Sequence, residues 1–517
     1  MTRRMSQDSE YQVVRACGSL WRSFSPTHQS SSSSYSSSSS SSLPISLSHS
    51  LSYITTMPST FFSLLFLFLL LLPFSTLSHL FSPPDNYLVN CGSAAPSSLV
   101  DHRPFVGDLV DHRSPFPRPV LLRNDNPLPD LPPIYHTARV FTSPARYSFP
   151  VSDKGTHIVR LHFYPFNSSN IDLSRAQFHV LLNGQVVLSN FTRLSSGSRN
   201  PRIVEYLMWV DADSLVLVFV PNKDSKLAFV NAIEVISAPK DLVPDTAQYL
   251  SPSKVEKFEG LNKQSLEVMH RVSVGGVKVT PFNDSLWRTW IPDDEFFKTS
   301  VGSEKRYFGG RIKYRVGGAS REVGPDNVYN SARLIQSKND SVPSVNMTWV
   351  FPVVGGYKYL VRLHFCDIAS ISLGLLYFNV YVNGYLAYED LDLSYITNSL
   401  ASPFYADFVV DGGDGALSVG VGPSKRSMSY CIDGILNAVE VMKLNNSLNS
   451  LDGEVSADFV MKSWSTGNNT AMLFTLVAAV CIVLSLSIVI RRKLLVSRES
   501  VSWSRLASNS SDDSVKN

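Results

Sequence analysis

Cysteine is scarce in this sequence, and neither sign of charge is in excess. The 517 residues include five cysteines without a CxxC pair, and no histidine cluster has the spacing of metal ligands. The common structural zinc motifs are therefore missing, and we expect no metal and no cofactor. Lysine and arginine total 46 against 43 aspartates and glutamates, a formal charge of +3. This balance argues against a nucleic acid or an acidic polymer as the main partner of the chain.

Motifs for catalysis are missing as well. The sequence has no Gly-rich GxGxxG loop, no VAIK-like lysine, no HRD loop and no DFG motif, all of which a protein kinase uses. It has no GxSxG elbow, and Asp293 and Asp294 stand in turn-like sequence with nothing to mark them as an acid/base pair. The Gly-rich residues 411–422 lack the GK[ST] ending of a phosphate loop, and we expect a hairpin turn there. We predict that the chain is not an enzyme.

Two apolar runs lie on either side of the central part of the sequence. Residues 471–490 carry no charge and are long enough to cross a bilayer as a helix, and the basic residues that follow mark a cytoplasmic side. Residues 57–78 have the pattern of a signal peptide, preceded by a Ser-rich extension, 1–56, that we expect to be disordered. These features predict a single-pass type I protein of the plasma membrane with residues 491–517 as its cytoplasmic tail. If Met1 and not Met57 is the start, the first run could instead act as an uncleaved anchor.

Between these runs the chain reads as all-β, and it contains an internal repeat. Short stretches alternate apolar and polar residues or are fully apolar, with Asn-Gly punctuation, which is typical of an antiparallel β-sandwich. Five motifs recur in the same order about 200 residues later. The pairs are Tyr135–Arg139 with Tyr329–Arg333, Phe149–Val151 with Phe351–Val353, Val159–Phe163 with Val361–Phe365, Phe178–Gly184 with Phe378–Gly384, and Val230–Val235 with Leu436–Val441. We infer a duplicated domain whose period is too long for a solenoid.

The repeat predicts the domain boundaries. We expect a first sandwich over residues 79–238 and a second over 258–443. Residues 239–257 are expected to form a polar linker, and residues 444–470 a flexible stalk above the membrane.

The repeated motifs, with YLVNCGS at residues 87–93 and WRTWIPDD at residues 287–294, resemble the tandem malectin-like ectodomain of plant receptor-like kinases of the FERONIA type. The resemblance covers the chain from the signal peptide through the membrane span. It implies two jelly-roll-like β-sandwiches followed by one transmembrane helix. It also implies that the partners are a secreted rapid alkalinization factor peptide with a lipid-anchored co-receptor, or pectic cell-wall polysaccharide. The family continues into a cytoplasmic kinase, whereas only 27 residues follow Ile490 here.

Two sets of repeated polar residues are candidate sites. Arg160 and His162, like their counterparts Arg362 and His364, alternate with apolar residues and should share one strand face. We interpret this face as structural, with ligand contact as the minor alternative. The Tyr135–Arg139 motif and its second copy could stack on and hydrogen-bond a sugar, but their presence in both copies favours a scaffold. We therefore assign no ligand-binding residue.

Covalent modifications are predicted outside the cell. Cys366 and Cys431 lie in the same domain and are candidates for a disulfide, although Cys91 could pair with either of them or be a free buried thiol. Sequons permit N-glycosylation at Asn167, Asn190, Asn283, Asn339, Asn346, Asn445 and Asn468.

The sequence thus favours a cell-surface binding protein that signals through a partner, or that competes for ligand with full-length receptor kinases. One alternative is a truncated gene model or splice form of such a kinase. The other is a carbohydrate-active enzyme, for which no recognisable acid/base pair is present.

Overall fold

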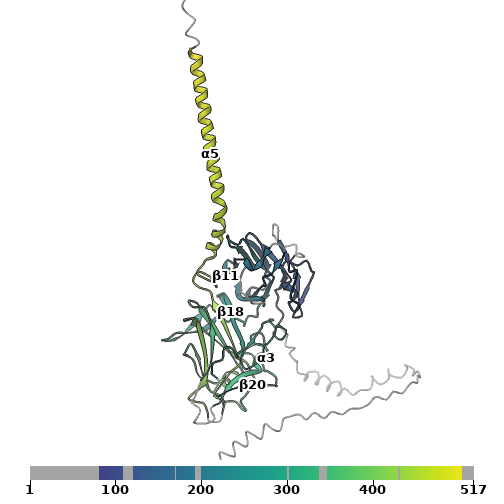
Figure 1. Ribbon diagram of the computed structural model, residues 1–517. Helices are drawn as coiled ribbons and strands as arrows, with labels where there is room; N and C mark the ends of the chain where they lie inside the picture. Colours follow the sequence, from purple (N-terminus) through teal and green to yellow (C-terminus); the bar gives the residue numbers. More distant parts are fainter. Residues whose placement is uncertain are drawn as a thin grey trace, which may run out of the picture. The chain divides into compact units, whose positions relative to one another are not determined.

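The computed structural model describes residues 81–108, 120–168, 171–191, 200–299, 302–336, 346–428 and 431–503. The predicted N-terminal extension, the predicted signal peptide and Asn339 lie outside the described residues, as does the end of the predicted tail. The described chain forms two β lobes followed by one long helix, α5 (Ala457–Trp503), which confirms the predicted all-β fold with a terminal helix (Figure 1).

Lobe 1 is a sandwich built from two main sheets. Its strands are β1 (Asn86–Asn90), β2 (Ser98–Val100), β3 (Arg103–Gly107), β4 (Val120–Arg123), β5 (Thr137–Phe141), β6 (Ala145–Pro150), β7 (Gly155–Phe163), β8 (Asn167–Ser168), β9 (Ile171–Asp172), β10 (Phe178–Leu182), β11 (Gln185–Phe191), β12 (Arg202–Val210), β13 (Ser214–Pro221), β14 (Ala228–Val230) and β15 (Ala232–Ser237), with 3-10 turns η2 (Pro133–Tyr135) and η3 (Leu173–Arg175). One layer has the order β12-β7-β15-β1-β3-β2, and the other has the order β11-β10-β13-β6, with β14-β5-β4 beside it. Fully buried phenylalanines and aliphatic residues fill the space between the layers.

Lobe 2 repeats this plan. Its strands are β16 (Thr246–Leu250), β17 (Val255–Glu259), β18 (Leu266–Ser273), β19 (Ile291–Pro292), β20 (Ser303–Tyr307), β21 (Ser331–Ile335), β22 (Met347–Pro352), β23 (Lys358–Phe365), β24 (Phe378–Val382), β25 (Tyr385–Leu391), β26 (Phe404–Asp411), β27 (Ala416–Pro423), β28 (Gly434–Leu436) and β29 (Ala438–Leu444), with short helices α3 (Asp326–Tyr329) and α4 (Leu393–Thr397) and turns η4 (Leu261–Lys263) and η5 (Pro281–Asn283). The layers have the orders β17-β16-β26-β23-β29-β18 and β22-β27-β24-β25, with β20-β21-β28 beside the second. Strand for strand, β7, β12 and β15 correspond to β23, β26 and β29.

The Asn-Gly motifs form the turns that their residues demand. They join β10 to β11 and β24 to β25, and both residues of each turn have positive φ: 46° and 79° at Asn183 and Gly184, 50° and 78° at Asn383 and Gly384. Such two-residue turns match the twist of paired strands and favour Asn and Gly, which tolerate positive φ. The Gly-rich residues 412–415 behave differently from the prediction. They connect β26 to β27, which belong to opposite layers, so this turn is not a hairpin.

The two lobes share one sheet, which the sequence does not predict. Strand β12 of lobe 1 pairs antiparallel with β18 of lobe 2 through Tyr206 opposite Glu267 and Leu207 opposite Leu266, giving a sheet of 13 strands. The expected linker, residues 239–257, is also partly structured, because it contains β16 and the start of β17, a hairpin at the edge of this sheet. A third apolar cluster, with members from both lobes, packs along the junction.

The segment that follows β29, expected to be a flexible stalk, is bound to lobe 1 along its first part. Val186 of β11 donates its N–H to the Asn449 carbonyl, and its own carbonyl accepts the Leu451 N–H at 2.8 Å. Leu451 is 1% exposed and belongs to the lobe 1 core. At the start of α5, Val460 and Trp464 pack against strands β10, β11 and β13.

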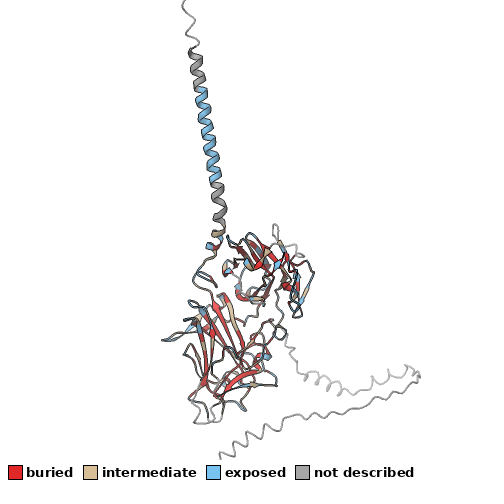
Figure 2. Cartoon of the chain, in the orientation of Figure 1, coloured by how far each residue is buried: buried red, intermediate tan, exposed pale blue. Residues whose placement is uncertain are grey.

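Farther along α5, Phe474–Leu494 is long and apolar enough to cross a membrane and is exposed along its length, while most strand residues are buried (Figure 2). This window overlaps the predicted span, 471–490.

Candidate functional site

The repeated Val-Arg-Leu-His-Phe motif occupies the central strand of each half of the shared sheet, in β7 and β23. Its apolar residues face the sandwich cores, and its arginine and histidine lie on the opposite face. That face is covered: Arg160 and His162 are each 4% exposed, and Arg362 and His364 are 0% exposed. The interpretation of these residues as structural is confirmed by the bonds that they make.

A row of alternating charges crosses the sheet from lobe 1 into lobe 2. Arg103 binds Glu234 at 2.6 Å, and Glu234 also accepts a hydrogen bond from Arg160 at 2.9 Å. Arg160 donates its Nε–H to Glu205 at 2.5 Å. Glu205 then accepts from Arg271 of lobe 2 at 2.7 Å, so one buried ion pair bridges the two lobes.

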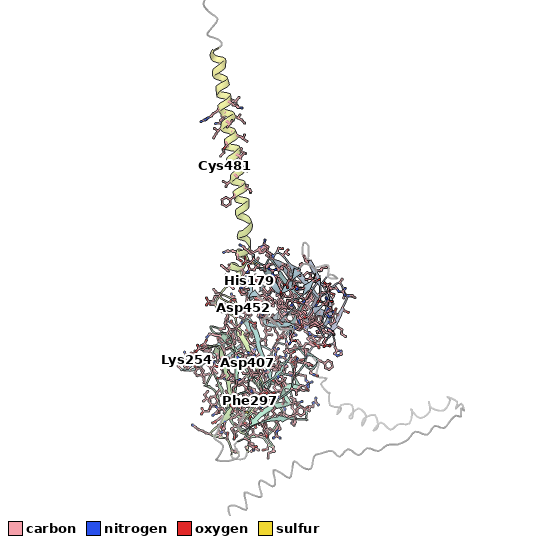
Figure 3. All side chains as sticks on the ribbon, in the orientation of Figure 1. His179, Lys254, Phe297, Asp407, Asp452 and Cys481 are labelled. Atoms are coloured by element: carbon pink, nitrogen blue, oxygen red, sulfur yellow. The ribbon has the colours of Figure 1, made fainter. Side chains whose placement is uncertain are left out.

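The row continues through lobe 2. Arg271 binds Glu440 at 2.8 Å, and His364 approaches the same carboxylate at 3.2 Å. Beside them Arg362 forms a two-pronged ion pair with Asp407, both distances being 2.8 Å. Asp407 lies amid the lobe's side chains in Figure 3, whereas Lys254, also labelled there, is 59% exposed.

Each carboxylate of the row is paired with at least one arginine. Burial alone would raise the pKa of Glu205, but Arg160 and Arg271 outweigh it and hold the pKa at about 2. Burial would also raise the pKa of Glu234, but Arg160 and His162 keep it well below its usual value. The carboxylates are therefore charged, and their partners are guanidiniums already in place. Within the described part, Arg103 Nε is the one buried nitrogen of the row without a partner. The other bonds are made inside the protein, so the row serves as a frame that joins the lobes.

The tyrosines of the repeated motifs are part of this frame. Tyr135 contacts His162 Nδ1 at 2.9 Å, and Tyr329 contacts His364 Nδ1 at the same distance. Burial lowers the pKa of His364, so the ring is neutral. Its Nε2–H then donates to the Glu440 carboxylate, and Nδ1 accepts from the tyrosine hydroxyl. Both tyrosines are buried, which excludes them from stacking on a sugar.

The arginines of the same motifs hold a buried carboxylate. Asp108 accepts the Gly92 N–H at 2.9 Å through Oδ1, and it accepts Arg139 Nε–H at 2.8 Å and the Tyr147 hydroxyl at 3.0 Å through Oδ2. The cluster ties the turn after β1 to β5 and β6.

Lobe 2 reproduces this cluster with one change of donor. Asp293 accepts from the Gly275 N–H at 3.0 Å, from Arg333 Nε at 2.5 Å and from the indole N–H of Trp349 at 2.8 Å. Its neighbour Asp294 is exposed and pairs with a lysine. Asp293 is thus committed to the scaffold, and the two adjacent carboxylates give no support to a hydrolase.

A surface cleft of about 680 Å³ lies between the β16–β17 hairpin and β26. We call it the hairpin cleft. It is lined by Pro244, Thr246, Ala247, Gln248, Val255, Glu256, Lys257, Gly317, Gly318, Tyr388, Phe404, Tyr405, Ala406, Asp407 and Phe408. The Tyr405 ring is fixed by Arg362, whose guanidinium lies 4.5 Å from its centroid. Aromatic surface with a few polar groups is typical of a binding site. Sequence reasoning missed it, because its walls come from segments about 150 residues apart.

The predicted disulfide stays a prediction. Cys366 is fully buried at the end of β23, and burial raises the pKa of its thiol. Cys431 is half-buried before β28.

The glycosylation sites also stay predictions. Asn167, Asn190 and Asn283 are exposed, Asn346 and Asn445 are half-buried, and the side chain of Asn468 lies outside the described part.

Comparison with known proteins places this geometry in a family. The sequence pattern of the malectin-like domain matches residues 89–444. A probable receptor-like protein kinase of Arabidopsis thaliana is 42% identical over 396 residues, covering 75% of this chain and 47% of that protein. Receptor-like protein kinase THESEUS 1 of the same plant is 38% identical over 400 residues, covering 76% of this chain and 46% of the kinase. The chain spans about half the length of the curated relatives that it matches.

Solved structures show the same fold. The extracellular domain of ANXUR2 from Arabidopsis thaliana superimposes with a TM-score of 0.65 at 27% identity, covering 71% of this chain and 98% of that one. A chain from the complex of the plant peptide RALF23 with FER and LLG2 gives a TM-score of 0.63 at 30% identity, covering 72% and 98%.

Proposed function

Because the chain belongs to the malectin-like domain family, and because the relatives that it matches are receptor-like kinases, we propose that it is a cell-surface receptor whose paired sandwiches bind a secreted ligand. The observation that carries this proposal is the order of parts: two β-sandwiches precede one exposed apolar helix, Phe474–Leu494. Arg491, Arg492 and Lys493 at the far end of that helix support an orientation with the sandwiches on the outer side of the plasma membrane.

A secreted peptide presented with a co-receptor is the ligand that the comparisons favour. The support is the structural likeness to a complex of RALF23 with FER and LLG2. A pectic polysaccharide is the second candidate, and the aromatic lining of the hairpin cleft supports it, since aromatic faces stack on sugar rings.

We place the ligand contact in the hairpin cleft. Its aromatic side chains Tyr388 and Phe404 belong to strands of opposite layers, so a ligand there touches both sheets of lobe 2. The charged frame beneath it, through Arg362 and Asp407, holds the cleft wall rigid. A rigid wall lowers the entropy lost on binding.

The test is binding to the full chain in lipid nanodiscs. Biolayer interferometry would use a RALF-type peptide premixed with its co-receptor and, separately, oligogalacturonides. We expect Tyr388→Ala with Phe404→Ala to weaken binding at least about tenfold, the loss of two aromatic contacts. Tyr395→Ala is the matched control, because Tyr395 is 88% exposed and lies outside the cleft. Binding of neither ligand to the wild-type chain would contradict the receptor function, and equal binding by all variants would contradict only the cleft.

Signal transfer requires a kinase either in the same transcript or in a partner. Sequencing the transcript beyond the codon for Asn517 distinguishes the two. A protease added to intact cells tests the topology: we expect the lobes to be digested, and protection of the lobes would overturn the proposal.

A further inference from the structure

A basic segment of lobe 2 stands apart from the balanced charge of the chain. Between Glu304 and Glu322 the sequence contains no aspartate or glutamate. The same stretch contains six basic residues: Lys305, Arg306, Arg311, Lys313, Arg315 and Arg321.

Three of these residues form a strip on one side of the chain. Arg311, Lys313 and Arg315 are exposed, while Ile312 between them is 3% exposed in the lobe 2 core and Tyr314 is half-buried against that core. Alternate burial places every second side chain on the same face. We call Arg311, Lys313 and Arg315 the basic strip.

The strip is anchored by its backbone. The Lys313 N–H donates to the Ala401 carbonyl at 2.7 Å, and the Lys313 carbonyl accepts the Ser402 hydroxyl at 3.0 Å. Below the strip, the Tyr314 hydroxyl donates to the Gly324 carbonyl at 3.0 Å. The three charges therefore project from a fixed scaffold, which lowers the entropic cost of engaging them together.

The strip lacks the carboxylates that neutralise its neighbours. Lys305 binds Asp294 at 2.6 Å. The other flanking cations also have partners: Arg306 pairs with Glu304 and Arg321 with Asp326. By contrast, within the described ranges no ion pair includes a residue of the strip, and Arg315 has only the carbonyl of Asn398 at 3.3 Å.

We propose that the basic strip docks an extended acidic peptide segment of a partner protein. In an extended chain, alternate side chains on one face repeat every ~7 Å. A segment with Asp or Glu at every second position therefore presents carboxylates at the spacing of the strip, one opposite each cation. Because the pairs stay hydrated, the contact speeds association, is weakened by salt and adds specificity to a larger interface. None of the three residues lines the hairpin cleft, although Gly317 and Gly318 just beyond Arg315 do, and the proposal does not depend on the ligand proposed there.

The experiment measures binding of two synthetic peptides to the full chain in nanodiscs made of zwitterionic lipid. One peptide alternates Glu with Thr, and the other has the same composition with its glutamates in one block. We expect tighter binding of the alternating peptide, which Arg311→Gln, Lys313→Gln and Arg315→Gln together weaken about tenfold, the sum of three exposed pairs. Raising the ionic strength from about 0.05 to 0.5 M should abolish the difference between wild type and variant.

The matched control removes three exposed cations elsewhere, Lys154→Gln, Lys254→Gln and Lys358→Gln, each of which has an ion-pair partner. We expect this variant to bind as the wild type does. Both triple variants should keep the wild-type unfolding temperature, because exposed side chains contribute little to stability. Equal loss in both variants, or no binding of either peptide, would mean that the strip is only a solvated face and would overturn the proposal. Tighter binding of polygalacturonate than of the alternating peptide would overturn it in favour of a polysaccharide.

Discussion

Among the described residues, the ion pair between Glu205 and Arg271 is the one buried charge contact that joins the two halves of the ionic row, and its removal has a calculable effect. Glu205→Gln leaves Arg160 and Arg271 without their shared carboxylate, at a site where the Glu205 side chain is 10% exposed. The lowering of the Glu205 pKa from 4.5 to about 2 corresponds to about 3 kcal/mol. Arg160 keeps Glu234 and Arg271 keeps Glu440, so we expect the cost to lie at the lower end of the ~3–5 kcal/mol for breaking a buried ion pair. We expect the free energy of unfolding to fall by about 3 kcal/mol at pH 7.

The pH dependence of this effect has a definite sign. The folded pKa of Glu205 lies below its unfolded value, so its stabilisation is complete above pH 4.5 and is lost as the pH falls through about 2. Urea titration of the full chain in detergent micelles, followed by tryptophan fluorescence, should show a constant difference between wild type and variant from pH 7 to 5 that shrinks below. Glu256→Gln on β17 is the control, because its pair with Lys254 is exposed and its loss should cost less than ~1 kcal/mol. If Glu205→Gln lowers the free energy of unfolding no more than this control does, the row does not stabilise the protein and the reasoning fails.

Further predictions concern the strand scaffold and its attachments. Leu451→Ala should lower the free energy of unfolding by ~2–5 kcal/mol, because Leu451 is packed in the lobe 1 core. A loss below about 0.5 kcal/mol in the same urea titration would mean that the segment after β29 is not bound to lobe 1. Asp108→Asn and Asp293→Asn should lower the unfolding temperature by similar amounts, because each carboxylate accepts hydrogen bonds from an arginine, a backbone N–H and one aromatic side chain. An unchanged unfolding temperature in either variant would contradict the equivalence of the two clusters. Non-reducing peptide mapping should recover Cys366 linked to Cys431, and alkylation of both thiols in the denatured, unreduced chain would refute that disulfide.

Much of the fold could be predicted because it is local and repeated. Alternating residues and Asn-Gly turns determine strands and hairpins over a few residues, and the second copy of each motif confirmed the first. The same logic identified the structural role of Arg160 and Arg362. Their burial follows from loop segments around Leu286 and Leu242 that the sequence pattern does not reveal, but residues retained by both copies are those that the shared scaffold needs.

Other features depend on contacts between distant segments and could not be predicted. The sheet that joins the lobes depends on a two-residue pairing of β12 with β18, and short pairings leave no sequence pattern. The carboxylates Glu234 and Glu440 were visible within a repeated motif, but their arginine partners lie on other strands. The docking of Leu451 was missed because a polar, Asn-rich segment reads as a linker even when one apolar residue anchors it. The basic strip was also missed, because the total charge of the chain is balanced and gives no sign of a local excess of cations.

The equivalence of the lobes also explains why the hairpin cleft occurs in lobe 2. By strand register, Arg202 and Ile203 of β12 occupy the positions of Phe404 and Tyr405 in β26. In both lobes the outer edge of this strand makes a two-residue pairing at equivalent positions, with β18 of the other lobe at Tyr206 and Leu207 and with β16 at Phe408 and Val409. The edge that joins lobe 1 to its partner is therefore taken in lobe 2 by the β16–β17 hairpin, which forms one wall of the hairpin cleft. The aromatic residues Phe404 and Tyr405 line that cleft, whereas the equivalent positions of lobe 1 hold Arg202 and Ile203. One duplicated edge thus joins the lobes in the first copy and borders the hairpin cleft in the second.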